Sequence, residues 1–207
     1  LVRAARDSGL WQAEIECLSS RQKYAVSARA IVNAAGPWIS KVLAERLGSG
    51  GRQPVRLIKG SHIVVRRLYA GEHAYVLQHP DRRIVFVIPY QDDFTLIGTT
   101  DVPWQGEPGP AVITPAETDY LCQTVNSYFE RKIRPGDVVW SYSGIRPLWD
   151  DAAAKASAVT RDYVLDIDAS QGQAPVLSVF GGKITNYRRV AEQGLAKLEP
   201  YLESLGA

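Results

Sequence analysis

Two segments of the chain share one pattern, which is an apolar strand, then glycine, then the start of a helix. The first spans residues 32–38 and places Gly36 before a proline. The second spans residues 178–186 and contains Gly181 and Gly182. Glycine permits a tight turn, and proline suits the first position of a helix. The pattern predicts two strand–turn–helix junctions, with strands at 30–35 and 175–180 that are continuously apolar and therefore covered on both faces.

Short alternating segments without helices between them fill the middle of the chain. They predict strands at 61–66, 74–78, 84–89 and 94–99, the last two joined by a polar turn at 90–93. Strands in such close succession pair in the antiparallel sense. Thr114, Pro115 and Glu117 then form a capping box that opens a helix. The buried stripe predicted for this helix is Leu121, Val125, Tyr128 and Phe129.

The remaining elements follow from the same periodicities. Residues 1–8 resemble the tail of a helix, and residues 10–35 read as strands. A helix follows Gly36 and ends at Gly48, and the polar stretch 48–54 predicts a crossing into a second unit. Further strands are expected at 138–143 and 163–167. A last helix carries its apolar stripe on Val190, Ala191, Leu195, Leu198 and Leu202.

Composition excludes several classes of protein. With 207 residues, 45% of them hydrophobic and 22% charged, the chain is globular rather than disordered. No apolar run is long enough to span a bilayer or to serve as a signal peptide. A net charge of +2 argues against a nucleic-acid surface.

Cys17 and Cys122 lack metal-binding spacing, which predicts a reducing compartment and no zinc site. The absence of methionine suggests a piece of a longer protein.

The glycine junctions and a few charged residues are the candidates for chemistry. A helix N-terminus behind a glycine turn suits a pyrophosphate or an electron-rich ring carbonyl, although the glycines could serve the turns alone. The sequence contains neither GxGxxG nor a P-loop, so the main phosphate loop of a dinucleotide site is not in it. Asp92-Asp93 and Asp150-Asp151 are turn-like pairs without a nearby histidine, which gives no case for a metal site.

Three basic residues are placed to bind an anion. Arg146 and Arg161 are each expected just beyond a strand end, and Lys183 follows the second glycine turn. The planar guanidinium matches phosphate or carboxylate with two hydrogen bonds. A surface ion pair is the alternative for each base, most of all for Arg161 beside Asp162. His62 begins an apolar strand and could take a proton near neutral pH, or it could be structural.

Five motifs in fixed order make the sequence familiar. They are VNAAGPW at 32–38, RLIKGSH at 56–62, IGTTD at 97–101, SGIRP at 143–147 and FGGKIT at 180–185. Together they resemble the FAD-dependent, quinone-linked glycerol-3-phosphate dehydrogenases, which are amino-acid oxidase-like (DAO) flavoenzymes. The resemblance implies a two-domain fold of mixed α+β and α/β class, in which an antiparallel substrate domain covers an FAD domain. It divides this chain into FAD-domain residues 1–47, substrate-domain residues 48–142 and FAD-domain residues 143–207.

The resemblance also assigns roles to residues. It implies that His62, Arg146 and Lys183 are catalytic and that Thr99, Arg146, Arg161 and Lys183 face the substrate, glycerol 3-phosphate. Residues implied to contact FAD are Ala35, Gly36, Gly144, Gly181, Gly182, Lys183, Ile184 and Thr185. His62 would accept the C2 hydroxyl proton while a hydride leaves for the flavin, which carries the redox chemistry. The N-terminal βαβ unit and the C-terminal helical region of the family are expected to be missing here.

The same resemblance implies a cellular setting. It suggests a cytoplasmic enzyme, peripheral on the inner face of the cell membrane, that passes electrons to quinone and forms a possible homodimer. Glycerol-3-phosphate oxidase and an amino-acid oxidase that uses Arg146 for a carboxylate are alternatives in the same enzyme class. A non-catalytic anion-binding module is the alternative from another class.

We predict that residues 1–207, purified alone, carry no stoichiometric FAD. The fingerprint that binds the ADP half of a dinucleotide is not in this sequence, and the glycine turns supply only part of the contacts. The absorbance spectrum of the purified chain measures this directly. One equivalent of bound flavin would contradict the prediction.

Overall fold

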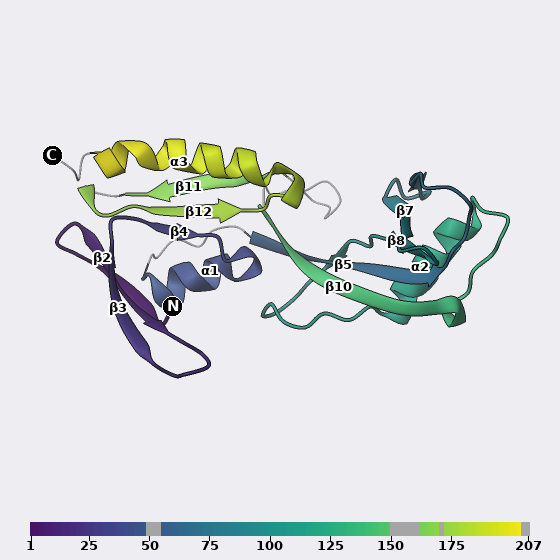
Figure 1. Cartoon of the computed structure of the whole chain (residues 1–207), viewed down its shortest axis with the longest axis horizontal. Coiled ribbons are helices and arrows are strands. Elements are labelled where there is room, and N and C mark those ends of the chain that lie inside the picture. The colour runs from purple at the N-terminus through teal and green to yellow at the C-terminus, as the bar shows by residue number, and fades with distance from the viewer. Residues whose placement is uncertain (49–54, 150–161, 170–171, 204–207) are drawn as a thin grey trace. The chain divides into compact units, whose positions relative to one another are not determined.

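The computed structural model describes residues 1–48, 55–149, 162–169 and 172–203, which form two compact units (Figure 1). Among the described residues, the first unit takes those up to Arg56 and those from Pro147 onward, and the second takes Leu57 to Arg146. Beyond Gly48, the predicted crossing at 48–54 lies outside the described residues. No helix in the described part of the chain is long and apolar enough to cross a membrane.

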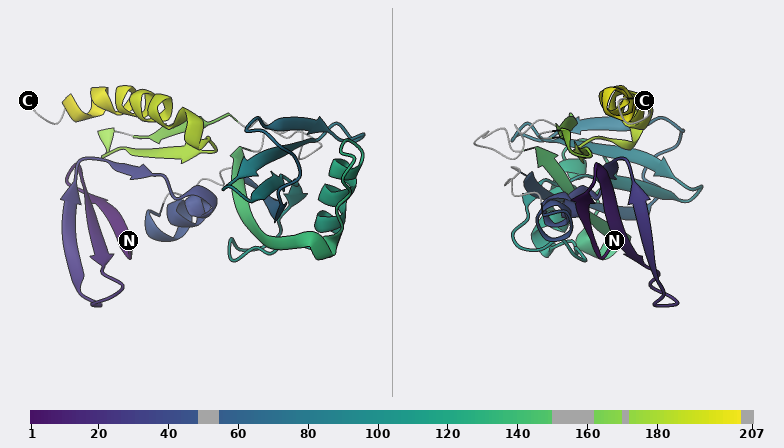
Figure 2. Two further views of the ribbon diagram at one scale, coloured as in Figure 1. Left: turned by 45° about the vertical axis from the view of Figure 1, so that its right-hand side comes forward. Right: turned by 90° about the vertical axis from the view of Figure 1, so that its left-hand side faces the viewer.

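A three-stranded sheet with a helix on each face organises the first unit (Figures 1 and 2). The strands, in spatial order, are β11 (Val164–Asp168), β12 (Val176–Phe180) and β4 (Ile31–Asn33). β12 pairs with β4 in parallel and with β11 in the antiparallel sense. One face carries α3 (Tyr187–Glu203), and the other carries a short helix made of η1 (Gly36–Trp38), α1 (Ile39–Lys41) and η2 (Val42–Arg46). Both predicted strand–turn–helix junctions are confirmed.

An antiparallel meander precedes this sheet in the sequence. It consists of β1 (Arg3–Asp7), β2 (Leu10–Glu16) and β3 (Lys23–Ala28). The helix tail predicted for residues 1–8 is therefore wrong. Ser8 and Gly9 both have positive φ and close a tight turn that pairs β1 with β2. This pairing overrides the helical preference of the alanines and arginines, which is a weak local bias. Trp11 is fully buried, and its indole nitrogen donates to Pro175 O at 2.8 Å.

The second unit is built on a larger antiparallel sheet. Its strands, in spatial order, are β10 (Val138–Trp149), β5 (Val55–Arg66), β8 (Phe94–Gly98), β7 (Ile84–Tyr90) and β6 (Tyr75–Gln78), and β9 (Val102–Pro103) also pairs with β5. The predicted β7–β8 hairpin is confirmed, with Tyr90 opposite Phe94. β10 and β5 each run for twelve residues and lie side by side in the sheet. η3 (Pro135–Asp137) leads into β10.

Helix α2 (Pro115–Asn126) covers one face of that sheet. Leu121 and Val125 are fully buried against the strands, in a core that also contains Ile63, Val87 and Ile97. The capping box predicted at the start of this helix is present. The prediction for its far end is only partly right, because the helix ends at Asn126 and Tyr128 does not join the buried stripe. Tyr128 is 56% exposed, whereas Phe129 packs partly buried against the core.

Of the two strands predicted to be covered on both faces, only the one at 175–180 is buried. β12 is buried, but Val32 in β4 is 55% exposed and Leu195 in α3 is 67% exposed. Leu198 is buried as predicted. Val32 and Leu195 line one apolar hollow beside β12. The apolar stripe of α3 therefore covers the sheet incompletely.

Candidate functional site

Three of the predicted site residues, His62, Thr99 and Arg146, come together on the open face of the sheet in the second unit. Side chains alternate between the two faces of a strand, so residues two apart share a face. In β5, Ser61, Ile63 and Val65 point to the side of α2, which leaves His62 on the opposite face. In β10, Tyr142 stacks on His62, with 4.8 Å between ring centroids and planes 4° apart. His62 and β10 thus meet on the face away from α2.

Arg146 also reaches this region, held by three acceptors from the segment after β8. Its Nη2 donates to Thr99 Oγ1 at 2.8 Å and to Thr100 O at 3.1 Å, and its Nη1 pairs with the carboxylate of Asp101. The Arg146 side chain is 32% exposed, whereas that of Asp101 is 8% exposed. The sequence prediction placed Arg146 just beyond a strand end. It lies inside β10 instead, because this strand continues through Pro147 to Trp149.

Two glycines make room for these side chains. A Cβ on Gly60 would lie 1.6 Å from Arg146 Nη2 and 2.7 Å from Thr99 Oγ1. A Cβ on Gly98 would lie 2.2 Å from His62 Cδ2. Gly98 is the direct cross-strand partner of His62, and the imidazole occupies the space that a side chain at Gly98 would need. Neither position has room for a side chain while Arg146 and His62 keep their places.

The environment of His62 favours its neutral form. Burial and, second, the positive charge of Arg146 lower the pKa of His62 below its ordinary value of 6.5. Its Nδ1 is buried and finds no hydrogen-bond partner among the described residues. A charged imidazole needs partners for both N–H groups, so this position disfavours the charged form as well. At neutral pH the ring therefore has a free lone pair and can accept a proton.

All of the residues predicted to contact FAD except Gly144 lie in the first unit. Because β4 and β12 are parallel neighbours, the turns that follow them leave the same edge of the sheet. Gly36, Gly181 and Gly182 in these turns have φ of 55°, 70° and 93°, a backbone conformation that favours glycine. A Cβ on Gly181 would lie 2.8 Å from Asp162 O. The apolar hollow beside β12, about 580 Å³ in volume, is lined by both glycines of the second turn and by Lys183.

The other predicted site residues are distributed as follows. Ala35 precedes Gly36 in the first turn, and Ile184 and Thr185 are exposed in η6 (Ile184–Asn186). Gly144 lies in β10 of the second unit, with open space where a Cβ would stand. Arg161 falls outside the described residues. The sequence did not predict three features of the site. They are the stacking of Tyr142 on His62, the ion pair between Asp101 and Arg146, and the space that Gly60 leaves for the guanidinium. The period-two spacing of Gly60 and His62 in β5 was the signal for the last of these.

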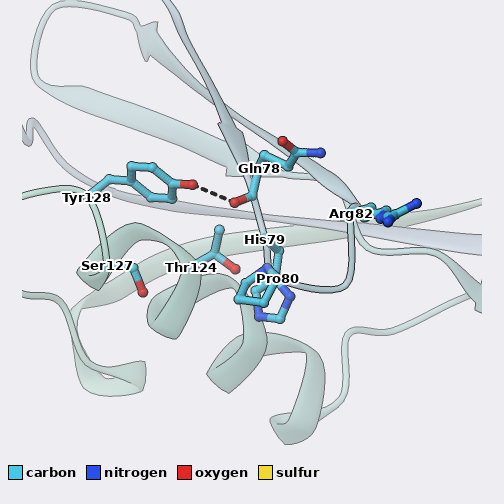
Figure 3. A pocket seen from close by; sticks show the side chains of 7 residues that line it. All are labelled: Gln78, His79, Pro80, Arg82, Thr124, Ser127 and Tyr128. Atoms are coloured by element: carbon cyan, nitrogen blue, oxygen red, sulfur yellow. Dashed lines mark hydrogen bonds between the residues drawn. The ribbon is translucent and has the colours of Figure 1, made fainter.

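A second hollow lies in the unit of the substrate residues, between the turn after β6 and the end of α2 (Figure 3). It measures about 620 Å³, and its lining includes His79, Arg82 and Tyr128. Tyr128 donates a hydrogen bond to Gln78 O there. None of the predicted site residues lines this hollow. The described residues contain no group of three or more His, Cys, Asp or Glu side chains that could hold a metal ion.

Comparison with known proteins gives the class first. The sequence matches the FAD dependent oxidoreductase family, DAO, over residues 1–187, so the chain belongs to this family. Within it, the chain is a homologue of glycerol-3-phosphate dehydrogenases. It is 49% identical to the glycerol-3-phosphate dehydrogenase of Pseudomonas aeruginosa over 205 residues, which are 99% of this chain and 40% of that protein. It is 44% identical to the D-erythritol 1-phosphate dehydrogenase of Brucella abortus, over 100% of this chain and 41% of that protein.

A solved structure supports the same relationship. The glycerol-3-phosphate dehydrogenase of Bacillus halodurans, complexed with FAD, superposes with a TM-score of 0.75 at 25% identity. The match covers 99% of this chain and 38% of that one. The chain therefore spans about 40% of the length of the relatives it matches. The family, fold class and cofactor class expected from the sequence motifs are confirmed.

Replacing Gly60 by alanine tests whether Arg146 depends on the space above this residue. The new methyl group would occupy the position of Arg146 Nη2, so the guanidinium must leave its three acceptors. In the complete enzyme that contains these residues, we expect Gly60→Ala to lower kcat/KM by about 100-fold, the scale of a misplaced catalytic group. Steady-state kinetics at matched flavin content measure this loss.

Gly109→Ala is the matched control, because a Cβ at Gly109 has open space around it. We expect this variant to keep the kinetics of the unmodified enzyme. Equal kcat/KM for both alanine variants would show that Arg146 does not need the gap above Gly60.

Proposed function

We propose that this chain is the substrate-binding part, with a portion of the flavin-binding part, of an enzyme that oxidises sn-glycerol 3-phosphate to dihydroxyacetone phosphate. One observation carries the proposal: a fixed arginine fork and a neutral histidine meet in the second unit beside an open sheet face. A phosphorylated secondary alcohol needs both groups, a cation for its phosphate and a base for its hydroxyl proton. The identity of 49% to a glycerol-3-phosphate dehydrogenase supports this substrate.

Arg146 binds the phosphate in this proposal. Its Nη1 already pairs with one carboxylate oxygen of Asp101, which helps to hold the guanidinium in place. The planar fork of an arginine matches the oxygens of a phosphate. Thr99 and Thr100 hold Nη2, so the arginine is oriented before the substrate arrives. A pre-oriented cation loses little conformational entropy on binding. The phosphate then anchors the substrate with its C2 near the histidine.

His62 accepts the proton of the C2 hydroxyl. Its pKa is lowered by burial and by Arg146, so the imidazole is neutral and basic at physiological pH. Tyr142 stacks on the ring and fixes its plane, and Gly98 lets it lie against the backbone of β8. A bound flavin supplies the acceptor for the hydride that leaves C2. These residues therefore orient the alcohol and remove its proton.

The first unit contributes to holding the FAD in this proposal. The two glycine turns bring backbone close to a ligand, and the apolar hollow that both Gly181 and Gly182 line fits an aromatic ring better than water. Lys183 lines this hollow together with the two glycines. Ala35 and Gly36, in the first turn, would contact the same cofactor from outside the hollow. The family to which the chain belongs and the FAD in the related Bacillus halodurans structure support this assignment.

Further parts of the proposal concern the whole enzyme. We propose quinone as electron acceptor, peripheral attachment to the inner face of the cell membrane, a homodimer, and substrate contacts from Arg161 and Lys183. D-erythritol 1-phosphate is a second candidate substrate, favoured by the 44% identity to a dehydrogenase of that compound. Both candidates are polyol phosphates and would use the same phosphate-binding group. A comparison of kcat/KM for the two compounds shows which one the enzyme prefers. The division of the chain into FAD-domain residues 1–47, substrate-domain residues 48–142 and FAD-domain residues 143–207 also remains a prediction.

Removing the guanidinium of Arg146 should impair substrate binding. In the complete enzyme, we expect Arg146→Ala to raise KM for glycerol 3-phosphate and to lower kcat/KM by about 30- to 1000-fold, or about 2–4 kcal/mol. Arg146→Lys should restore little, because an ammonium group cannot reproduce the fork. Arg188→Ala, in an exposed position of α3, is the matched control. Unchanged kinetics for both Arg146 variants would make this residue structural.

Replacing His62 by glutamine should remove the base while keeping a polar side chain. We expect anaerobic flavin reduction to slow by about 100-fold or more, the usual scale of general-base catalysis. In the unmodified enzyme, kcat/KM should fall as pH drops through the pKa of His62, which lies below 6.5, because protonation removes the lone pair. Stopped-flow reduction across pH measures both effects.

His73→Gln, in a loop of the same unit, is the control for this experiment. It should leave both the rate and the acid limb unchanged. If His62→Gln reduces its flavin at the unmodified rate with the same acid limb, another group is the base.

A further inference from the structure

The carboxylate of Glu117 lies at the centre of a buried hydrogen-bond network in the second unit. Its side chain and that of Lys59 are each 6% exposed, and Lys59 Nζ lies 2.8 Å from Glu117 Oε2. The same oxygen accepts from the backbone N–H and the hydroxyl of Thr114, both at 2.8 Å. Oε1 accepts from the hydroxyls of Ser61 and Thr100, both at 2.8 Å. Every partner donates, so this position requires an ionised carboxylate.

The charge on Glu117 is stable at every physiological pH. Burial alone would raise its pKa, but hydrogen bonds from Lys59, Thr114, Thr100 and Ser61 lower the pKa of Glu117 to about 2. An acid with this pKa does not exchange protons during a reaction near neutral pH. The carboxylate is therefore a fixed acceptor rather than an acid or a base.

Because Glu117 can only accept, the donor and the acceptor of each hydrogen bond in the network are fixed. An ionised carboxylate cannot donate, so the Ser61 hydroxyl proton points to Glu117. The hydroxyl of Ser143, 2.8 Å from Ser61 Oγ, must then donate to Ser61. Thr100 Oγ1 gives its proton to Glu117 and accepts from Ser61 N at 3.0 Å. One carboxylate thus orients a hydroxyl on β5, one on β10 and one after β8.

Two of the residues that carry these hydroxyls, Thr100 and Ser143, are linked to Arg146. Thr100 presents its side chain to Glu117 and its carbonyl to Arg146 Nη2, at 3.1 Å. Ser143 lies on β10, three residues before Arg146, and its link through Ser61 fixes this strand against β5. The acceptor of the guanidinium and the strand that carries it are therefore both tied to the same buried group.

We propose that Glu117 is a positioning residue, which aims Arg146 at the substrate phosphate by fixing Thr100 and β10. The proposal rests on the proposed function of Arg146. Glu117 lies on the α2 side of the sheet and acts through its neighbours, not through contact with substrate. A misaimed guanidinium weakens the phosphate contact even though the arginine itself is intact.

The test is a double-mutant cycle in the complete, flavin-loaded enzyme. Glu117→Gln keeps the size of the side chain but turns an amide N–H group toward a donor. We expect kcat/KM for glycerol 3-phosphate to fall about 10- to 100-fold, mostly through KM. In an Arg146→Ala background the same change should cost less than about 3-fold, because no guanidinium remains to be misaimed. Asp119→Asn, an exposed acid on the same helix, is the matched control and should have no effect in either background.

The outcomes separate the alternatives. A full, additive loss in the Arg146→Ala background, or no loss in the unmodified one, overturns the positioning role while leaving the role of Arg146 intact. Unmodified kinetics for Arg146→Ala itself refute the proposed function at this residue, and the positioning role falls with it. If Glu117→Gln does not accumulate as folded protein, Ser143→Ala serves in its place. Ser143→Ala removes only the last donor of the network. The positioning role then requires that this variant lowers kcat/KM in the unmodified enzyme and has a much smaller effect in the Arg146→Ala background.

Discussion

The buried carboxylate of Glu117 joins the parts of the second unit that the candidate site needs. It caps its own helix through Thr114, pairs with Lys59 from β5, and receives hydroxyl protons from Ser61 and Thr100. A buried ion pair adds little net stability compared with a well-packed apolar pair. Removing one partner is costly, however, because the other charge is left unpaired. The interaction therefore selects one arrangement of strand, helix and loop over other ways of packing the same core.

Alternation along the strands carries this constraint to the opposite face of the sheet. Ser61 points to α2, and the next residue, His62, points away from it and stacks on Tyr142. Gly60, also on the open side, leaves the volume that Arg146 occupies. A site of this kind depends as much on missing side chains as on the ones present. The rigid sheet supplies the accuracy that a loop-borne site lacks.

Local patterns predicted a good part of the fold. The capping box before α2, the β7–β8 hairpin and the two glycine junctions were all recognisable, because each depends on a few neighbouring residues. The strand at Arg3–Asp7 was not, since its helix-favouring residues extend only by pairing with β2. The exposure of Val32 was missed for a related reason, because burial depends on what packs over a strand and not on the strand itself.

The candidate site was predictable in composition but not in geometry. His62, Thr99 and Arg146 were named from the motifs, and the structure brings them together. The long-range contacts of Asp101, Tyr142 and Glu117 became visible only with the coordinates. The partners lie 45 residues apart in sequence for Arg146–Asp101 and 56 for Ser61–Glu117. Spacing along a chain does not report such contacts.

The most direct test of the account is a crystal structure of the complete enzyme with glycerol 3-phosphate bound. We predict the phosphate within hydrogen-bond distance of the Arg146 guanidinium and the C2 hydroxyl about 3 Å from a ring nitrogen of His62. Arg146 should still contact Thr99 and Thr100 in that complex. A phosphate bound elsewhere, with Arg146 paired only to Asp101 and no substrate hydroxyl near His62, would contradict the account.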